Sequence, residues 1–358
     1  MSTERILEHL EALVAFDTQN PPRALDAEAP IFAYLSKQLA PEFEISVTDH
    51  GKGRVSYLAR RGSPDILFNV HLDTVPALPG SKYPPLQLTR EGDRVYGRGA
   101  CDIKGAAACL LALAETSEAP LALLFTTDEE GGEGCCVNEF VAHGLTAGYR
   151  QVVVAEPTLC RAEVRHRGFL SARGHFHGVA GHSSEPRALQ DNAIHRLANW
   201  TGAALEAARQ AEAEGRRSCF NIGTVGGGVK SNVIADGADI FWSARLAPGD
   251  SNEAFMDDCR SWPGSEHAQW TVSFSGPPLP TGEHSAEAAT AFAQQHELEL
   301  GEGVDFWTEA SLFGAGGVPA LVLGPGDIDQ AHARDEWVAI DQLETAYGLY
   351  RQLAEAHV

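Results

Sequence analysis

The stretch Tyr96-Gly-Arg-Gly-Ala-Cys-Asp102-Ile-Lys-Gly105 places a single carboxylate, that of Asp102, between a glycine-rich turn and an apolar helix. The helix is predicted by the small and apolar side chains of residues 106–113. An aspartate before such a helix is typical of an N-cap, where it accepts hydrogen bonds from unpaired backbone N–H groups. We expect Asp102 at the N-cap. We also consider a second role, because other acidic residues and histidines occupy comparable positions elsewhere.

These other candidates follow three short apolar runs that read as buried strands. The runs cover residues 65–70, 120–126 and 151–155. His71 follows the first run and Glu156 follows the third, whereas the pair Glu129 and Glu130 follows the second. Ligands of α/β proteins bind beyond the carboxyl ends of parallel strands. We therefore expect these side chains to meet at one edge of the sheet, with His332 joining them from far downstream.

Two kinds of pattern divide the chain. Short apolar strands alternating with helices predict an α/β fold with a mostly parallel sheet. After about residue 163 the strands become half-polar and follow a β-α-β-β-α-β order, which is typical of a ferredoxin-like α+β unit. The first pattern returns after residue 276. We expect a larger catalytic domain formed by residues 1–163 and 277–358, with a smaller α+β domain inserted at residues 164–276.

The totals exclude several classes of function. A formal net charge of −22 argues against nucleic acid or an anionic membrane as a partner. The chain has no apolar run of membrane-spanning length, and its first residues predict an amphipathic helix in place of a signal peptide. Seven cysteines at irregular spacing, without a CxxC pair, favour a reduced cytoplasmic protein and argue against a structural thiolate zinc site.

Carboxylates and imidazoles favour zinc, cobalt or manganese as ligated metals. Two such ions about 3.5–4 Å apart can share a carboxylate and a water molecule. One residue of the Glu129–Glu130 pair would then bind metal while the other faces the water. Each candidate also has an ordinary alternative: a solvated turn for the glutamates, and a structural hydrogen-bonded histidine for His71, oriented by Asp73. Their joint occurrence at strand ends favours the metal site.

Six segments in chain order resemble the dinuclear-metal amidohydrolases of the M20 peptidase family. They are His71-Leu-Asp-Thr-Val-Pro76, Gly97-Arg-Gly-Ala-Cys-Asp-Ile-Lys-Gly105, Thr127-Asp-Glu-Glu-Gly131, Ala155-Glu-Pro-Thr158, Gly181-His-Ser-Ser184 and Ala331-His332. Further segments look most like the acetylornithine deacetylase branch of that family, which includes N-acetylcitrulline-specific relatives. They are Leu323-Gly-Pro-Gly326 followed by Gln330-Ala-His332 and Asp335-Glu336, together with Thr308-Glu-Ala310.

The resemblance implies two divalent metal ions, zinc or cobalt with manganese as a third choice. Asp102 would bridge them. His71 and Glu156 would complete one metal site, and Glu130 and His332 would complete the other.

Further roles follow from the same resemblance. Glu129 would be the general base that takes a proton from the bridging water and passes it to the leaving amine. Asp73 would support His71 from behind. The family also has a non-proline cis peptide after the bridging aspartate, which corresponds here to Asp102–Ile103.

For the inserted domain, the resemblance implies a lid and a dimerisation surface. His182 would reach across a homodimer interface and stabilise the oxyanion of the tetrahedral intermediate. Asn232 and Arg245 would contact substrate, and a guanidinium such as that of Arg245 is suited to a bidentate grip on an α-carboxylate. Arg167 is a second candidate for that grip. For either arginine the alternative is a surface salt bridge.

The activity implied is metal-dependent hydrolysis of the N-acetyl amide of a small N-acetylated amino acid, N-acetylcitrulline or N-acetylornithine, in arginine biosynthesis. A desuccinylase, an aminoacylase or a dipeptidase would be an alternative on the same scaffold. A metal-dependent binding protein without turnover is disfavoured by the intact Glu129. A dinuclear phosphatase would call for a glycine-rich or basic phosphate cradle near the ligands, and the sequence around them offers none.

Overall fold

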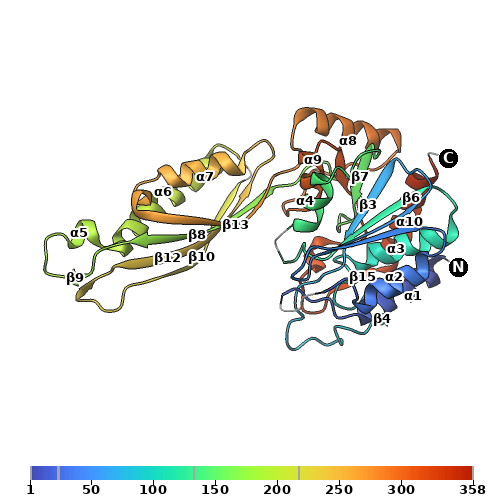
Figure 1. Cartoon of the computed structure of the whole chain (residues 1–358), viewed down its shortest axis with the longest axis horizontal. Coiled ribbons are helices and arrows are strands. Elements are labelled where there is room, and N and C mark those ends of the chain that lie inside the picture. Colours follow the sequence, from blue (N-terminus) through green and yellow to red (C-terminus); the bar gives the residue numbers. More distant parts are fainter. Residues whose placement is uncertain (1, 22–24, 132–133, 217, 357–358) are drawn as a thin grey trace. The chain divides into compact units, whose positions relative to one another are not determined.

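The computed structural model describes residues 2–21, 25–131, 134–216 and 218–356. The chain divides into two compact units (Figure 1). Unit 1 comprises Met1–Arg165, Gly282–Val304 and Thr308–Val358, and unit 2 comprises His166–Thr281 and Asp305–Trp307. The domain boundaries expected from the sequence, at residues 163/164 and 276/277, stay predictions.

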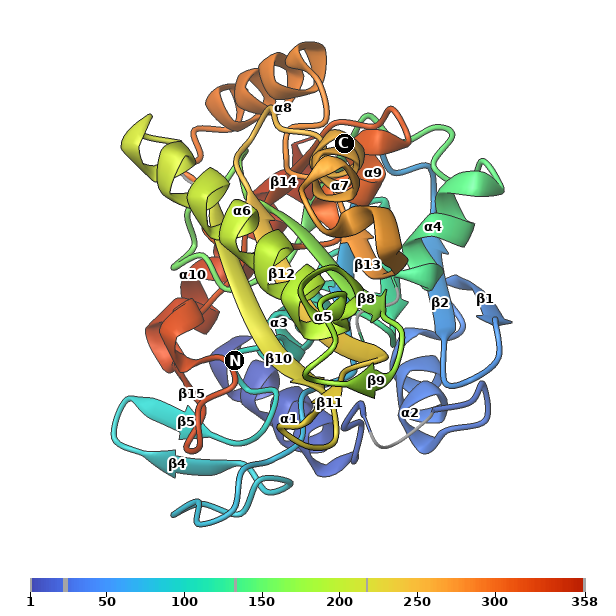
Figure 2. The ribbon, with the colours of Figure 1, turned by 90° about the vertical axis from the view of Figure 1, so that its left-hand side faces the viewer.

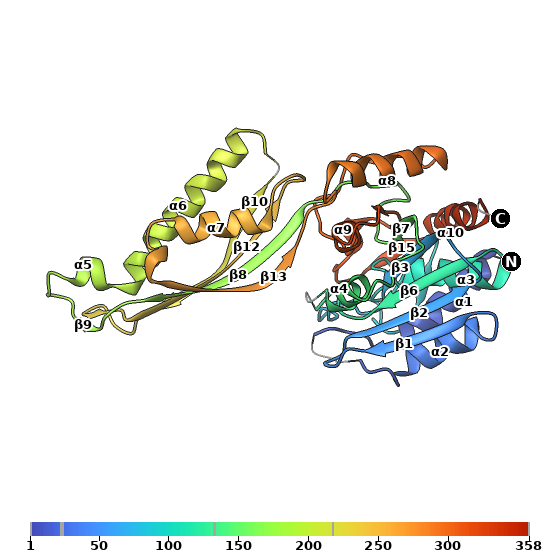
Figure 3. The same cartoon turned by 45° about the horizontal axis from the view of Figure 1, so that its top comes forward.

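A six-stranded sheet in the order β1-β2-β6-β3-β7-β14 forms the centre of unit 1 (Figure 3). Its strands are β1 (Glu44–Asp49), β2 (Val55–Arg61), β3 (Ile66–His71), β6 (Leu121–Thr126), β7 (Gln151–Val154) and β14 (Ala320–Val322). β3 pairs in parallel with both β6 and β7, and β7 with β14, whereas β2 pairs antiparallel with β1 and β6. Every residue of β3, β6 and β7 is buried, as strands covered on both faces require. The mostly parallel sheet predicted from the sequence is confirmed.

Helices cover both faces of this sheet (Figure 3). On one face lie α1 (Ser2–Ala15), α2 (Pro30–Leu39), α3 (Lys104–Thr116) and α10 (Ile340–Glu355); on the other lie α4 (Cys135–Ala142) and α9 (Ala310–Ala315), with α8 (Glu283–Gln295) near β14. The helix α3 is buried from Lys104 to Ala114 because its alanine-rich sequence fits between α1 and α10. On the opposite face, the rings of Phe140 and Phe313 join α4 to α9, with ring centroids 6.4 Å apart.

The N-cap predicted for Asp102 is wrong. The structure begins α3 at Lys104 and gives the N-cap position to Ile103. The Asp102 carboxylate turns instead toward two histidine rings, those of His71 and His332. The peptide between Asp102 and Ile103 is cis, as the family resemblance implied.

A small three-stranded sheet, which the sequence patterns did not indicate, lies beside the turn that carries Asp102. Its order is β15-β5-β4, with β4 (Thr89–Glu91), β5 (Arg94–Tyr96) and β15 (Trp337–Ala339). Tyr96 pairs with Trp337, and the guanidinium of Arg94 lies 3.8 Å from the centroid of the Trp337 ring. This pairing places the chain that enters the Asp102 turn beside the chain that leaves His332.

Unit 2 is a four-stranded antiparallel sheet with helices on one face (Figure 2). Its elements are β8 (Gly168–His177), β9 (Gly181–His182), α5 (Ala188–Asp191), α6 (Ala193–Ala213), β10 (Cys219–Gly227), β11 (Val233–Ile234), β12 (Gly237–Leu246), α7 (Asn252–Ser261), η1 (Ser265–His267) and β13 (Ala268–Gly276). The main sheet has the order β10-β12-β8-β13, and β9 pairs separately with β11. The β-α-β-β-α-β order predicted from the sequence is confirmed, with β9, β11 and α5 as additions.

The core of unit 2 is built on aromatic rings. Trp200 of α6 is fully buried, and its indole nitrogen donates to the backbone oxygen of Cys259 at 2.8 Å. The rings of Phe176, Trp242 and Trp270 surround it. Over the described residues, no helix of either unit has the length and apolar character needed to cross a membrane.

Candidate metal centre

Three adjacent parallel strands of unit 1 end at one place. β3 lies between β6 and β7, and the three finish at His71, Thr126 and Val154. The chain then turns at each end, and these turns carry the acidic residues predicted from the sequence. Because the strands are parallel and neighbouring, their carboxyl ends bring side chains together that are far apart along the chain.

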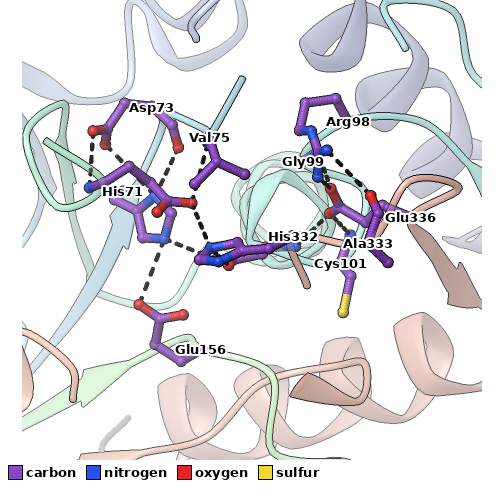
Figure 4. A network of polar contacts seen from close by, with 12 residues as sticks. His71, Asp73, Val75, Arg98, Gly99, Cys101, Glu156, His332, Ala333 and Glu336 are labelled. Carbon is purple, nitrogen blue, oxygen red and sulfur yellow. Dashed lines mark hydrogen bonds and ion pairs between the residues drawn. The ribbon is translucent and has the colours of Figure 1, made fainter. Parts of the chain in front are cut away.

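The first group of potential ligands consists of His71, Asp102 and Glu156 (Figure 4). The His71 Nε2 atom lies 3.0 Å from Asp102 Oδ1 and 3.5 Å from Glu156 Oε1. All three residues are buried, with exposed fractions of 1%, 6% and 4% respectively. One ligand atom from each lies within 4.8 Å of the others, which is the spacing of atoms around a single metal ion.

The second group consists of Asp102, Glu130 and His332. The His332 Nε2 atom lies 3.3 Å from Asp102 Oδ2 and 3.2 Å from Glu130 Oε1. His332 comes from the loop between β14 and β15, where its φ is +59°. Asp102 belongs to both groups and presents a different oxygen to each, as a carboxylate that bridges two ions would.

The contacts behind His71 include one that sequence reasoning missed. Its Nδ1 atom lies 2.8 Å from the backbone oxygen of Asp73, which leaves Nε2 for the first group of ligands. The Asp73 carboxylate is 3.6 Å from the ring, so the backbone and not the side chain holds it. That carboxylate accepts from the Glu130 backbone N–H and from the side-chain amide of Asn20, both at 3.1 Å. No charged motif surrounds Asn20 in the sequence, so no local pattern indicates this contact.

The electrostatics of the cluster favour added positive charge. Burial, together with the charge of Asp102, raises the pKa of Glu130 to about 7. Burial also raises the pKa of Glu156. The hydrogen bonds from His332 and His71 outweigh the burial of Asp102 and lower its pKa. In turn, hydrogen bonds to Asp102 and Glu130 raise the pKa of His332 to about 10.

Such a cluster fits divalent cations. Neighbouring buried carboxylates repel one another unless protons or cations lie between them. The oxygen and imidazole donors of both groups match the preferences of zinc, cobalt and manganese. The residues therefore suit two ions that share Asp102.

Glu129 belongs to neither group, although the charges of residues from both groups act on its carboxyl. Burial raises the pKa of its carboxyl well above the usual value, and the charges of Glu130, Glu156 and Asp102 act in the same direction. Its neighbour Asp128 faces away, and accepts from the backbone N–H groups of Cys135 and Cys136 at the start of α4. Gly134 occupies the N-cap position of α4, and the Asp128 carboxylate satisfies two of the N–H groups at the start of that helix.

The other predicted site residues belong to unit 2. His182 pairs with Val233 in the short β9–β11 ladder, and the backbone N–H of Ser183 donates to the Asn232 oxygen at 3.2 Å. His182 and Asn232 are therefore neighbours. The His182 ring is exposed, and its Nδ1 lies 2.7 Å from the Ser184 hydroxyl.

The two predicted arginines lie elsewhere in unit 2. Arg245 is on β12, with its guanidinium 4.0 Å from the centroid of the Phe169 ring. Arg167 pairs with Asp305 at 3.0 Å and also contacts the Cys219 sulfur at 2.8 Å. Arg167 thus forms an ion pair, the alternative that the sequence left open, and its role as a substrate contact stays a prediction.

A two-unit α/β protein with such a cluster has the organisation of a metallohydrolase. The sequence profile of peptidase family M20/M25/M40 matches residues 67–356, and the chain belongs to this family.

Individual proteins match over nearly the whole chain. The chain is 46% identical over 349 residues to the N-acetyl-L-citrulline deacetylase of Xanthomonas campestris pv. campestris, with 94% of each chain covered. It is 29% identical to the acetylornithine deacetylase of Aliivibrio salmonicida, over 88% of this chain and 87% of that one. A tripeptidase from Staphylococcus aureus subsp. aureus Mu50 shares the fold, with a TM-score of 0.74, 18% identity, and 99% and 98% of the two chains covered.

The Asn20 contact gives a first prediction. Replacement of Asn20 by alanine removes a donor to Asp73, which also holds the backbone of Glu130. We expect Co²⁺ affinity, measured by chelator competition, to fall about 10–100-fold, the usual effect of losing such support. The control is Asn138→Ala on the exposed side of α4, which should bind Co²⁺ like the wild type. Unchanged affinity in Asn20→Ala would contradict the role given to this contact.

Proposed function

We propose that the protein hydrolyses the N-acetyl amide of an α-N-acetylated amino acid, N-acetylcitrulline or N-acetylornithine, to acetate and the free amino acid. The observation that carries this proposal is the sharing of Asp102, a buried residue, between two groups of potential metal ligands. The substrate class is supported by the 46% identity to an N-acetyl-L-citrulline deacetylase and by the acetylornithine deacetylase match. The setting that we propose is arginine biosynthesis in the cytoplasm.

Two divalent ions, zinc or cobalt with manganese as a third choice, belong to this proposal. His71, Asp102 and Glu156 would hold one, and Asp102, Glu130 and His332 would hold the other. When bound, the ions supply a Lewis acid for the amide carbonyl and lower the pKa of a water molecule.

The remaining chemistry falls to the side chains. Glu129, which belongs to neither group, would accept a proton from the attacking water. The water oxygen then bonds to the acetyl carbon, and the C–N bond breaks as Glu129 returns the proton to the leaving nitrogen. Asp73 would keep its neighbours in place through the backbone of Glu130. Arg245 and Arg167 are our candidates for the substrate carboxylate, and Asn232 for a polar contact.

The geometry of unit 2 supports a homodimer in which His182 acts on the partner's substrate. Arg245 pairs with Phe169 at one end of the sheet, whereas Gly237 pairs with His177 at the end that leads to His182. The eight residue-to-residue steps from Gly237 to Arg245 span about 26 Å of extended strand. An N-acetylated amino acid is far shorter than this. If both His182 and Arg245 contact substrate, they therefore contact different substrate molecules, as they would in a dimer formed through unit 2.

The direct test compares release of free amine from N-acetylcitrulline and N-acetylornithine, with added Zn²⁺ or Co²⁺ and with chelator. We expect metal-dependent deacetylation by the wild type, and a rate lowered about 10²–10⁴-fold in Glu129→Gln because the base is lost. Glu129→Gln should keep its Co²⁺, whereas the matched variant Glu130→Gln should lose part of it. No amine release from any N-acyl amino acid would overturn the proposed function, and full activity of Glu129→Gln would overturn its role.

A mixing experiment tests the role of His182 across the dimer. Glu129→Gln and His182→Ala chains, each of low activity alone, are coexpressed with different tags and the mixed dimer is purified. One of its two sites then combines an intact Glu129 with an intact His182 from the other chain. Random pairing should restore about a quarter of wild-type activity in the unfractionated mixture. Absence of restoration in the purified mixed dimer would show that His182 acts within its own chain or not at all.

A further inference from the structure

Glu336 is a buried carboxylate outside both ligand groups, and its four hydrogen bonds converge on the turn that carries Asp102. Its side chain is 3% exposed. The Oε1 atom accepts from the backbone N–H groups of Cys101 and Asp102 at 2.9 and 3.0 Å. The Oε2 atom accepts from the backbone N–H of Gly99 at 3.0 Å and from Arg98 Nη1 at 2.6 Å. These bonds occupy the full acceptor capacity of a carboxylate.

The turn needs such an acceptor because it belongs neither to β5 nor to α3. Gly99 has a φ of +84°, and a Cβ at this position would lie 2.8 Å from the Thr74 side chain, so the close approach requires glycine. Successive N–H groups of such a turn point into one concave space, which is an anion-binding arrangement. Here the anion is the Glu336 side chain, supplied from a segment more than two hundred residues downstream.

Arg98 connects this turn to the second histidine. Its Nη1 pairs with Glu336, while its Nη2 donates to the backbone oxygen of Ala333 at 3.1 Å (Figure 4). Ala333 directly follows His332, whose φ is positive. A single guanidinium therefore joins the carboxylate that holds Asp102 to the loop that presents His332. Both Arg98 and Glu336 are buried, so water does not weaken the pair.

We propose that Arg98 and Glu336 are positioning residues of the metal centre: they hold the Asp102 turn and the His332 loop in ligand geometry before metal binds, and so set metal affinity. This inference rests on the metal centre of the proposed function, but not on its substrate. Arg98 also offsets the charge that Glu336 adds close to Asp102.

A purely structural role is the competing explanation, because the same pair lies beside the β5–β15 pairing. Arg94 provides the matched control. It belongs to the same small sheet, and its guanidinium stacks on Trp337 across the β5–β15 pairing. This stacking supports the sheet and does not involve the turn that carries Asp102. A change in Arg94 should therefore loosen the sheet without releasing the ligands.

The experiment uses the full-length chain, stripped of metal, with Co²⁺ alone as the probe. Glu336→Gln, Arg98→Lys and Arg94→Ala are compared with the wild type by Co²⁺ titration and by hydrogen exchange of the metal-free proteins. Glutamine places an N–H₂ group against backbone donors, so we expect faster exchange in residues 97–103 and Co²⁺ binding weakened about 10–100-fold. Arg98→Lys keeps the positive charge, but a lysine cannot contact both Glu336 and the Ala333 oxygen as the guanidinium does. Its Co²⁺ affinity should therefore fall most at the ligand group that contains His332.

Arg94→Ala should bind Co²⁺ with the wild-type affinity. Wild-type Co²⁺ affinity and exchange in a folded Glu336→Gln protein would overturn the proposal, as would an equal loss of affinity in Arg94→Ala. If Glu336→Gln does not fold, Arg98→Lys decides, and unchanged Co²⁺ binding there overturns it. Because neither readout involves turnover, a wild type that binds Co²⁺ but releases no amine would refute the proposed substrate while leaving this inference standing.

Discussion

Carboxylates gather at the ends of three parallel strands of unit 1, and their mutual repulsion must be balanced. This requirement is the main constraint on the structure of unit 1. Asp102, Glu129, Glu130 and Glu156 meet in a space where burial raises the pKa of three of them. Asp102 stays ionised because two imidazoles bond to its two oxygens. Such an arrangement lowers the stability of the fold unless cations neutralise it. Binding of divalent cations is therefore the best explanation for this cluster of carboxylates.

Two features of the fold bring the cluster together. The parallel pairing of β6, β3 and β7 aligns three strand ends, which accounts for His71, Glu156 and the glutamate pair. The small β15-β5-β4 sheet accounts for the rest, because it brings the His332 loop beside the turn that carries Asp102. The Arg98–Glu336 pair then joins these two segments by side-chain contacts. The metal centre thus depends on the alignment of the carboxyl ends of parallel strands and on the long-range pairing of β15 with β5.

Features that depend on neighbouring residues, such as strands and the residues at their ends, could be predicted from the sequence. Apolar runs identified the buried strands, and strand ends identified His71 and Glu156 as candidates, because a period-two or continuous apolar pattern is a property of neighbouring residues. The N-cap prediction for Asp102 failed because the rings of His71 and His332 compete for its carboxylate, and Ile103 takes the N-cap position of α3. Contacts between distant segments left no local signal. This is why the contacts of Asn20 and Glu336 and the pairing of Arg167 with Asp305 emerged only from the structure, although the sequence resemblance already included Glu336.

The central claim is that Asp102 joins two cation sites into one centre, and a Co²⁺ titration of the metal-free chain tests it most directly. The wild type should bind two ions per chain. Glu156→Gln and Glu130→Gln each remove a ligand that belongs to one group only, so each variant should keep one tight Co²⁺ site. Asp102→Asn should weaken Co²⁺ binding at both sites. If Asp102→Asn lost only one ion, or if the wild type bound only one, the shared carboxylate would not be the centre of this structure.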